Sequence, residues 1–437
     1  PDCSRLAAQS IQTAAPEAVA TPPAPQRPKV LPTAPSLRAP APERPHWTSH
    51  FIVPTANEIL VRLYTDEGIE GFGLATSYTP IDFAIKAWQG GLAEQILGED
   101  ALAPERLYQK LFGLTTSRVA NERGWSREAL IRISAAVDIA CWDIVGKAAG
   151  LPLYRLFGGY RDEVPAYVTC GYYREGKDLA ELRDEMHMLL DQGHTGFKAK
   201  AGGLPVPEDV ERMAVMREVI GPECDFMIDP NRAWDLPTAI DAARRLERLN
   251  PRWLEEPVRW EDDRRGLKLL SQKTRIPLSG GESEMTSYGC RAMLEEQAIQ
   301  ILQFDCTMMG GFTEGRKLTG LCELNHVQVA PHHDCFIHAH IVASSPAGCI
   351  VESFTDPQRD PLQGDGSVGE GVDRLEVAGQ VADEVRRGED GVGDRLRDLR
   401  FAAARQDGHQ GEVTCRVGNH RRRSAVPAVL PAQHRVR

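Results

Sequence analysis

Short apolar segments alternate with amphipathic helical segments over residues 151–362, and this alternation limits the possible folds more than any other feature. Helical patterns such as 209–220 and 237–249 separate the apolar segments. Strands that alternate with helices form parallel sheets with right-handed crossovers. Eight such strands predict an α/β protein with a closed (β/α)8 barrel of the TIM type. The expected strands are VPAYVTC (164–170), GFKAK (196–200), DFMIDP (225–230), WLEEP (253–257), IPLSGGE (276–282), ILQFD (301–305), VQVAPHH (327–333) and CIVES (349–353).

Residues 46–150 show an α+β pattern that predicts a cap domain in front of the barrel. EILVRLYTD (58–66) alternates like a strand, and EGIEGFG (67–73) supplies a glycine turn and a returning strand. ISAAVDIACWDIVGKAAG (133–150) carries apolar residues at helical spacing and ends in glycine, a common residue just after a helix.

Both ends of the chain lack a core pattern. Residues 1–45 are rich in Ala and Pro and show no sustained period, so we expect a disordered extension. Residues 363–437 are rich in Gly, Asp, Val and Arg and contain no lysine. We expect this tail to be a solvated, non-native extension, in preference to a functional basic tail.

The composition excludes several classes of protein. The 437 residues carry a formal net charge of −11, which disfavours binding to nucleic acid because phosphates need basic side chains. The sequence contains no run of about 18 or more apolar residues, so we expect no membrane span. The ten cysteines form no CxxC pair, and the start shows no secretory pattern, so we expect a cytoplasmic protein.

Ionisable side chains stand at the carboxyl ends of seven consecutive expected strands. Catalytic groups of (β/α)8 barrels project from these ends, so the series predicts one shared site at the mouth of the barrel. In chain order the residues are Lys198 and Lys200, Asp229 with Asn231, Glu255 and Glu256, Glu282, Asp305, His332 and His333, and Glu352.

Three of these residues, Asp229, Glu255 and Glu282, are acids on adjacent strands. Their hard oxygen atoms suit Mg2+, and without a cation the carboxylates would repel or become protonated. The competing interpretation is that each acid pairs with a neighbouring Lys or Arg. Strand alternation puts Glu255 and Glu256 on opposite faces, so only one of them should reach the metal.

Two further ionisable residues flank the acids. Lys200 lies on one side and His332 on the other, and Asp305 could bond the imidazole and fix its tautomer. Lys200 and His332 would therefore flank whatever the metal holds.

These motifs resemble the mandelate racemase subgroup of the enolase superfamily over roughly residues 46–362. The segment AAVDIACWDIVGKAAGLPLYRLFGG (135–159) resembles the family signature at the junction of cap and barrel. The motifs that match in order are KxK (Lys198, Lys200), Asp-x-Asn (Asp229, Asn231), WLEEP (Glu255), GGE (Glu282), the Asp305/His332 pair and Glu352.

The resemblance implies a role for each matching residue. Asp229, Glu255 and Glu282 would bind Mg2+, which selects the first glutamate of WLEEP. Lys200 would be a base on one face of the substrate, with its pKa lowered by Lys198 and the metal. The remaining roles are acid or base for His332, orientation of His332 for Asp305, binding of the substrate carboxylate for Lys198, and a hydrogen bond to the enolate oxygen for Glu352. Asn231, Tyr78, Trp47 and His50 are further candidates for substrate contact, although Trp47 and His50 could equally be packing residues. The family also implies a homo-oligomer.

The expected reaction begins with removal of the proton next to a carboxylate, which metal and hydrogen-bond donors assist. We favour loss of a 3-hydroxyl from an acid sugar of the aldonate type, with help from protonated His332, to give a 2-keto-3-deoxy acid. Return of a proton instead would make a racemase or epimerase. Cycloisomerase and enolase subgroups fit less well, because the resemblance places a lysine where this chain has Asp305.

Two other interpretations stay open. APHHDCFIHAH (330–340) contains four histidines, which suggests a zinc hydrolase, but the first strand lacks the HxH expected there. An inactive relative is the second. The family has a strand before 58–66 and a returning segment after the eighth barrel strand, and both places hold low-complexity sequence here. Frame errors in a GC-rich gene would explain this and would leave the cap incomplete.

Overall fold

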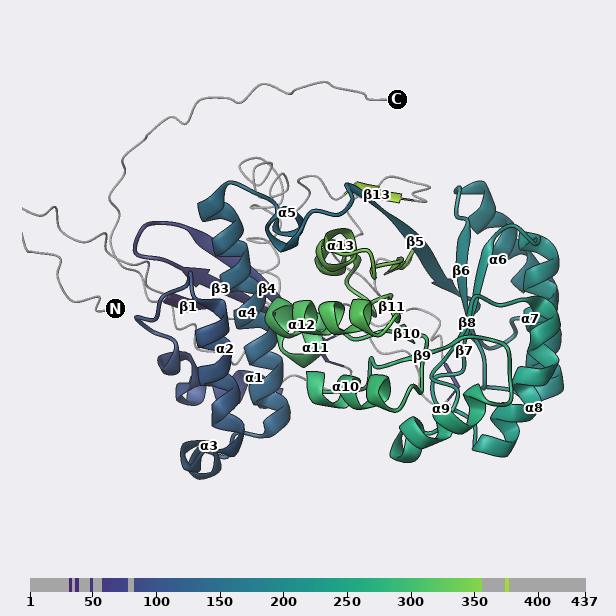
Figure 1. The fold of residues 1–437 in the computed structure, drawn as a ribbon, viewed down its shortest axis with the longest axis horizontal. Helices are drawn as coiled ribbons and strands as arrows, with labels where there is room; N and C mark the ends of the chain where they lie inside the picture. The colour runs from purple at the N-terminus through teal and green to yellow at the C-terminus, as the bar shows by residue number, and fades with distance from the viewer. Residues whose placement is uncertain are drawn as a thin grey trace, which may run out of the picture.

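The chain forms an α+β cap that packs against a (β/α)8 barrel (Figure 1). The computed structural model describes residues 31–33, 36–38, 48–49, 57–77, 82–355 and 374–376. Helix α4 (Arg127–Ala149) lies between the cap strands and the barrel helices, so it is buried on several sides. In this described part of the chain, no helix is long and apolar enough to cross a bilayer.

The cap sheet is antiparallel and is built on β3 (Asn57–Tyr64). Its neighbour β4 (Glu70–Ser77) returns along one edge after a tight turn at Gly68, where φ is +82°. The inward residues of β3 are Ile59, Val61 and Leu63, all buried, as strand alternation predicts.

Two short strands, β1 (Leu31–Thr33) and β2 (Ser36–Arg38), pair with β3 in antiparallel fashion. They lie within residues 1–45, where no strand was expected. The open edge of β3 offers unpaired backbone groups, and such pairing needs no local apolar pattern. The two strands occupy the place of the cap strand that the family resemblance implied.

The cap helices cover the sheet and lead into the barrel. Helix α4 begins after Ser126, whose side chain accepts a hydrogen bond from Ala129 N, and ends at Gly150 with φ +64°. It therefore starts earlier than the expected 133. The other elements are α1 (Asp82–Ala87), η1 (Trp88–Leu92), η2 (Ala93–Gln95), α2 (Pro104–Gly113), η3 (Leu114–Thr116), α3 (Arg118–Arg123) and α5 (Leu153–Phe157).

Eight parallel strands form the barrel, so the expected fold class is confirmed. The last strand pairs with the first, and a parallel bridge between Val329 and Gly348 joins the remaining two edges. The strands are β5 (Glu163–Cys170), β6 (Gly196–Lys200), β7 (Asp225–Asp229), β8 (Trp253–Glu255), β9 (Leu278–Gly280), β10 (Ile301–Leu302), β11 (Gln328–Val329) and β12 (Val351–Ser353).

One more strand, β13 (Arg374–Glu376), pairs antiparallel with β5. It lies within residues 363–437, for which a solvated extension was expected. The structure therefore places at least this part of the tail against the barrel.

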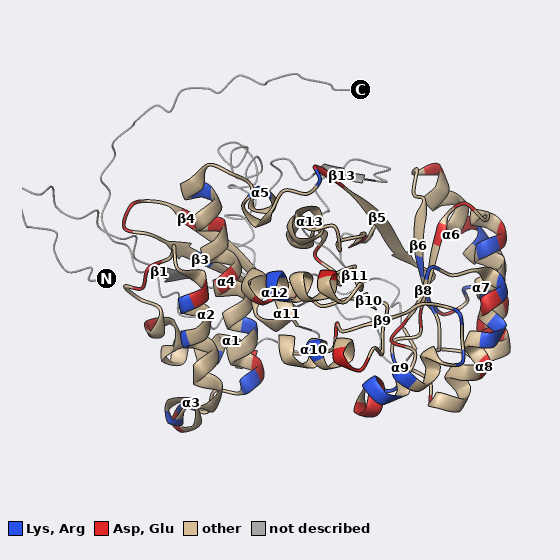
Figure 2. Cartoon of the chain, in the orientation of Figure 1, with Lys and Arg blue, Asp and Glu red and all other residues tan. Residues whose placement is uncertain are grey.

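Amphipathic helices surround the strands, and charged residues recur along α7, α8 and α9 (Figure 2). Asp178 and Asp235 cap the first turns of α6 and α8, which explains where these helices begin. The elements are α6 (Leu179–Asp191), α7 (Val206–Ile220), α8 (Leu236–Leu246), η4 (Glu247–Leu249), η5 (Trp260–Asp262), α9 (Asp263–Ser271), α10 (Ser287–Glu295), α11 (Cys306–Met309), α12 (Gly311–Leu324) and α13 (Cys335–Ser344).

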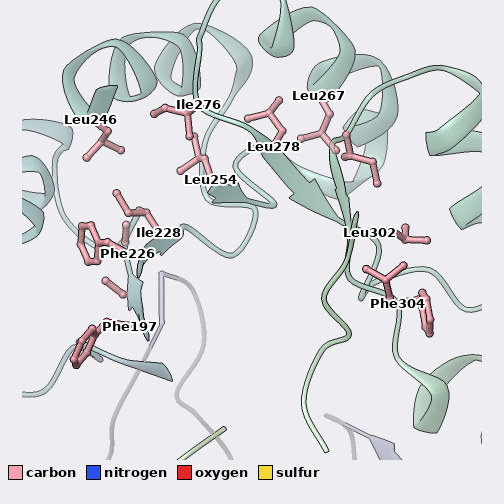
Figure 3. Close-up of a cluster of buried hydrophobic side chains, with 14 of the residues drawn as sticks. Phe197, Phe226, Ile228, Leu246, Leu254, Leu267, Ile276, Leu278, Leu302 and Phe304 are labelled. Carbon is pink, nitrogen blue, oxygen red and sulfur yellow. The ribbon is translucent and has the colours of Figure 1, made fainter. Parts of the chain in front are cut away.

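Alternation along the strands sorts their side chains into two sets. One set is apolar and packs beneath the helices, as for Phe197, Ile228 and Leu254 (Figure 3). The other set points into the barrel, where Tyr167, Met227, Trp253, Ile301, Ala330 and Ile350 form a separate buried cluster. Farther along β6, β7 and β8, the same inward register presents charged residues, and this places the site.

Candidate functional site

The lysines of β6 bind the acids of the neighbouring strands. Lys198 Nζ lies 2.6 Å from Glu255 Oε1, 2.8 Å from Glu352 Oε1 and 3.9 Å from Asp229 Oδ2. Lys200 Nζ forms an ion pair with Asp229 Oδ2. All five side chains are buried. The site is therefore a closed network of opposite charges at the mouth of the barrel.

This pairing corresponds to the competing interpretation for two of the three expected metal ligands, Asp229 and Glu255. As placed, the side chains of the described residues form no group of three His, Cys, Asp or Glu that could hold a metal ion. The ammonium group of Lys198 lies close to both carboxylates and acts as their cation.

Among the described residues, the buried oxygen atoms at the same mouth that lack a hydrogen-bond donor include Glu282 Oε2 and Asn231 Oδ1. Burial raises the pKa of Glu255 to about 8; Lys198 opposes this rise, and the charges of Asp229 and Glu282 add to it. Unpartnered oxygens and mutually repelling carboxylates are what a divalent cation would stabilise. The residues present therefore fit Mg2+.

The two glutamates of WLEEP separate as alternation predicts. Glu255 binds Lys198 inside the barrel, whereas Glu256 accepts a hydrogen bond from Ser283 Oγ at 2.9 Å and lies 3.3 Å from Arg232 Nε. Burial, assisted by the charge of Glu282, raises the pKa of Glu256 to about 7. Both acids are thus near Glu282, but only Glu255 shares a cation with Asp229.

Without a bound metal, the pKa of Lys200 is raised. Burial works to lower it, and Lys198 does too, as expected, but the ion pair with Asp229 outweighs both. The expectation for this pKa left out the direct ion pair with Asp229, and the effect of a bound metal on this pKa stays a prediction. The pKa of Lys198 is also raised, because Glu255 and Glu352 overcome the effect of burial.

His332 and Asp305 form the expected pair. His332 Nδ1 lies 2.9 Å from Asp305 Oδ2, and His332 Nε2 lies 3.7 Å from Glu282 Oε2. Burial alone would lower the pKa of His332, but Glu282 and Asp305 raise it to about 9. Asp305 caps α11 through Thr307 N at 2.8 Å, so local structure fixes the carboxylate that holds the imidazole.

Glu352 accepts hydrogen bonds from three directions. Its donors are Thr169 Oγ1 at 2.5 Å, Lys198 Nζ at 2.8 Å and His333 N at 2.9 Å. Burial would raise its pKa, but Lys198 and the other nearby cations hold the pKa well below the ordinary value. These three donors hold the Glu352 carboxylate in one orientation, and its expected hydrogen bond to an enolate oxygen stays a prediction.

Comparison with known proteins shows the family to which the chain belongs. Residues 34–158 match the mandelate racemase/muconate lactonizing enzyme N-terminal domain, and residues 181–381 match the enolase C-terminal domain-like family. The arabinonate dehydratase of Saccharolobus solfataricus is 32% identical over 276 residues, which cover 63% of this chain and 72% of the relative. The protein belongs to the mandelate racemase/muconate lactonizing enzyme family. It is an enzyme of the enolase superfamily.

Other members of the mandelate racemase family are similar to the same extent. The 3,6-anhydro-alpha-L-galactonate cycloisomerase of Streptomyces coelicolor is 30% identical over 319 residues, covering 72% of this chain and 85% of the relative. A solved family member from a marine actinobacterium, in complex with magnesium, is 33% identical with a TM-score of 0.67. That match covers 77% of this chain and 89% of the solved one. The family is thus shown, while its members differ in reaction.

Several supporting residues of this family site were not singled out from the sequence. Glu255 Oε2 accepts hydrogen bonds from Trp253 Nε1 at 3.0 Å and Gln303 Nε2 at 2.5 Å. Arg212 donates to the carbonyl of Lys200 at 3.1 Å and so holds the end of β6. Gln303 and Thr169 stand at inward positions next to the expected strand ends, a signal that alternation could have supplied. Arg212 lies on α7, and nothing local in the sequence indicates its contact.

Three candidates for substrate contact, Trp47, His50 and Tyr78, lie outside the described residues. Between the first two, Ser49 Oγ donates a hydrogen bond to the carbonyl of Pro230 at 2.8 Å. Ser49 therefore contacts the loop that follows β7, directly after Asp229.

The histidines of 330–340 do not gather around a common point. His338 Nδ1 lies 2.8 Å from His333 O, and its Nε2 accepts a hydrogen bond from Cys306 N at 2.9 Å. His340 Nδ1 lies 3.3 Å from Tyr154 N, and burial lowers its pKa to about 4. Since backbone groups engage both residues, the geometry gives no support to a zinc hydrolase.

Proposed function

We propose that this protein is a Mg2+-dependent dehydratase that converts an acid sugar of the aldonate type into a 2-keto-3-deoxy acid. The observation that carries the proposal is the pair of Asp305 and His332, which follow β10 and β11, nearly across the ring of strands from Lys200 on β6. Three carboxylates from the strands between them would hold the metal. An acid and a base thus stand on either side of one candidate substrate position.

Asp229, Glu255 and Glu282 would hold Mg2+ in place of the lysine ammonium groups. When bound, Mg2+ would polarise the substrate carboxylate and neutralise the charge that develops on it. Lys198, freed from Glu255, would donate hydrogen bonds to the same substrate carboxylate. Glu352, which lies 2.8 Å from Lys198 Nζ, would orient this lysine.

Lys200 would remove the proton from the carbon next to the carboxylate. It must be neutral to do so, and the ion pair with Asp229 now opposes that. If the charge of Asp229 is engaged by a cation, burial and Lys198 remain, and both lower the pKa of Lys200. Occupation of the site would therefore activate the base.

His332 would protonate the departing 3-hydroxyl from Nε2, while Asp305 holds the opposite ring nitrogen. A raised pKa keeps the imidazole protonated near neutral pH, as this role requires. The same pair could instead return a proton to the substrate carbon, which would give a racemase or epimerase. A cycloisomerase relative keeps a third outcome in view, since the initial proton removal would be shared.

A screen of acid sugars for 2-keto acid formation tests the proposal, with His332→Asn as the matched variant. Wild type should form a 2-keto acid with Mg2+ but not with Zn2+. In deuterated water, His332→Asn should still exchange the hydrogen next to the carboxylate through Lys200, yet lose dehydration. Exchange by wild type without any 2-keto acid would indicate a racemase, and activity with Zn2+ alone would contradict the proposal.

A further inference from the structure

The loop that carries His332 has an unusual backbone. His333 and Asp334 have φ angles of +57° and +38°, in the left-handed region that residues with side chains rarely adopt. Two successive residues in this region persist only where surrounding contacts hold them. The contacts of Asp334 are therefore informative.

The Asp334 carboxylate lies within hydrogen-bond distance of hydroxyl groups from two different parts of the fold. Its Oδ2 atom lies 3.0 Å from Thr76 Oγ1 and 3.0 Å from Thr307 Oγ1. All three side chains are buried, so water cannot easily replace these hydrogen bonds. Thr76 belongs to β4 of the cap, whereas Thr307 and Asp334 belong to the barrel.

Thr307 extends this contact to the catalytic candidates. Its hydroxyl lies 2.7 Å from Asp305 Oδ1, and Asp305 Oδ2 lies 2.9 Å from His332 Nδ1. A continuous chain of buried hydrogen-bonding groups thus runs from the cap strand to the imidazole. In order, its members are Thr76, Asp334, Thr307, Asp305 and His332.

We propose that Thr76 and Asp334 are positioning residues, through which the cap sets the orientation of the Asp305–His332 pair. The single proton of the Thr307 hydroxyl is shared between Asp334 Oδ2 and the nearer Asp305 Oδ1, so Asp334 influences how this hydroxyl holds one oxygen of Asp305. The other oxygen is thereby directed at His332 Nδ1. A catalytic role for His332 rests on the function proposed above, but the hydrogen-bond chain itself does not.

Histidine NMR of the full-length protein without substrate tests the inference. With 15N-histidine labelling, His332→Asn assigns the resonance of the proton between His332 Nδ1 and Asp305. Thr76→Val removes the cap hydroxyl at nearly constant volume and should shift this resonance. Thr76→Ser restores a hydroxyl and should return the resonance toward its wild-type position.

Thr319→Val is the matched control, because Thr319 is a buried threonine on α12 whose hydroxyl donates a hydrogen bond to Gly315 O at 2.8 Å. It should leave the His332 resonance unchanged. If Thr76→Val does not fold, Asp334→Asn should produce the shift instead. An unchanged resonance in both variants, or an equal shift in Thr319→Val, would overturn the inference.

The kinetic consequence separates this inference from the proposed function. With the acid sugar that the screen identifies, Thr76→Val should lower kcat roughly fivefold to tenfold and change KM little, as for loss of one buried hydrogen bond. A resonance shift with no dehydration in wild type would overturn only the proposed function. Dehydration in wild type with no resonance shift in Thr76→Val would overturn only the positioning role.

Discussion

Asp138 is a buried carboxyl group on α4, away from the mouth of the barrel. Its Oδ2 atom accepts a hydrogen bond from Thr313 N at 2.9 Å, in the first turn of α12. Burial raises the pKa of Asp138 to about 8, although its hydrogen bonds with Thr313 work in the opposite direction. The Asp138 carboxyl group on α4 thus caps the first turn of α12, and this group is partly neutral near physiological pH.

This residue predicts a pH dependence of stability. Asp138 is protonated in both states below its unfolded pKa of about 4, where its stabilising contribution is complete. As pH rises toward the folded value of about 8, only the unfolded state loses the proton, and the contribution falls by up to about 1.4 kcal/mol per pH unit. Urea unfolding of wild type and Asp138→Asn at about pH 5 and about pH 8 measures this. Relative to the variant, wild type should have a lower free energy of unfolding at the higher pH than at the lower pH. A difference between the two proteins that does not change with pH would contradict the raised pKa.

At the scale of elements, β4 approaches α4 closely at two glycines. A Cβ at Gly73 would lie 1.8 Å from Ala136 O, and one at Gly71 would lie 2.3 Å from Ala140 O. No side chain can occupy these positions unless the strand moves away from the helix. The same strand carries Thr76, so its distance from the barrel depends on this contact.

Gly73→Ala should therefore destabilise the protein by about 2–4 kcal/mol, since backbone atoms must separate. Denaturant unfolding measures the change. Gly113→Ala is the control, because a Cβ there meets nothing within 4 Å and its φ is helical at −58°. That variant should be neutral or slightly stabilising. Equal destabilisation by the two substitutions would show that the close approach does not matter.

Elements also show how far the sequence alone leads. The alternation of short apolar segments with helical segments identified all eight barrel strands, and the expected strand GFKAK coincides with β6. The expected strands 301–305 and 327–333 were too long at their carboxyl ends, because β10 and β11 contain only two residues each. Their polar ends leave the sheet as loops that aim Asp305 and His332. β1, β2 and β13 were missed since pairing with a distant strand, and no local period, defines them.

For the whole molecule, the contacts that join cap and barrel were beyond sequence reasoning. Thr76 and Asp334 are 258 positions apart, and no pattern in either segment indicates the other. The pairing of lysines with acids was foreseen only as a competing interpretation, because alternation fixes which face a side chain takes but not its partner. The roles of the site residues remain predictions, and Mg2+ binding tests them together.

Mg2+ should raise the melting temperature of the whole protein by a few degrees at saturating concentration, because it binds the folded state alone and relieves repulsion among buried acids. Thermal unfolding with Mg2+ and with EDTA measures the shift. Glu282→Gln should reduce it, since one expected ligand is lost. Glu295→Gln removes an exposed acid on α10 and should leave the shift intact. Identical shifts in both variants would argue against the acid site.

Among the described non-glycine residues with left-handed φ, five follow the carboxyl ends of barrel strands, namely Asn231, Arg232, Glu256, His333 and Asp334. Each such conformation costs about 1–3 kcal/mol. The rim that would perform chemistry is thus the least relaxed part of the scaffold. Glycine at these positions would relieve the backbone strain, but it would also hold the neighbouring functional groups less firmly. Selection for thermostability and selection for turnover would therefore favour opposite changes at this rim.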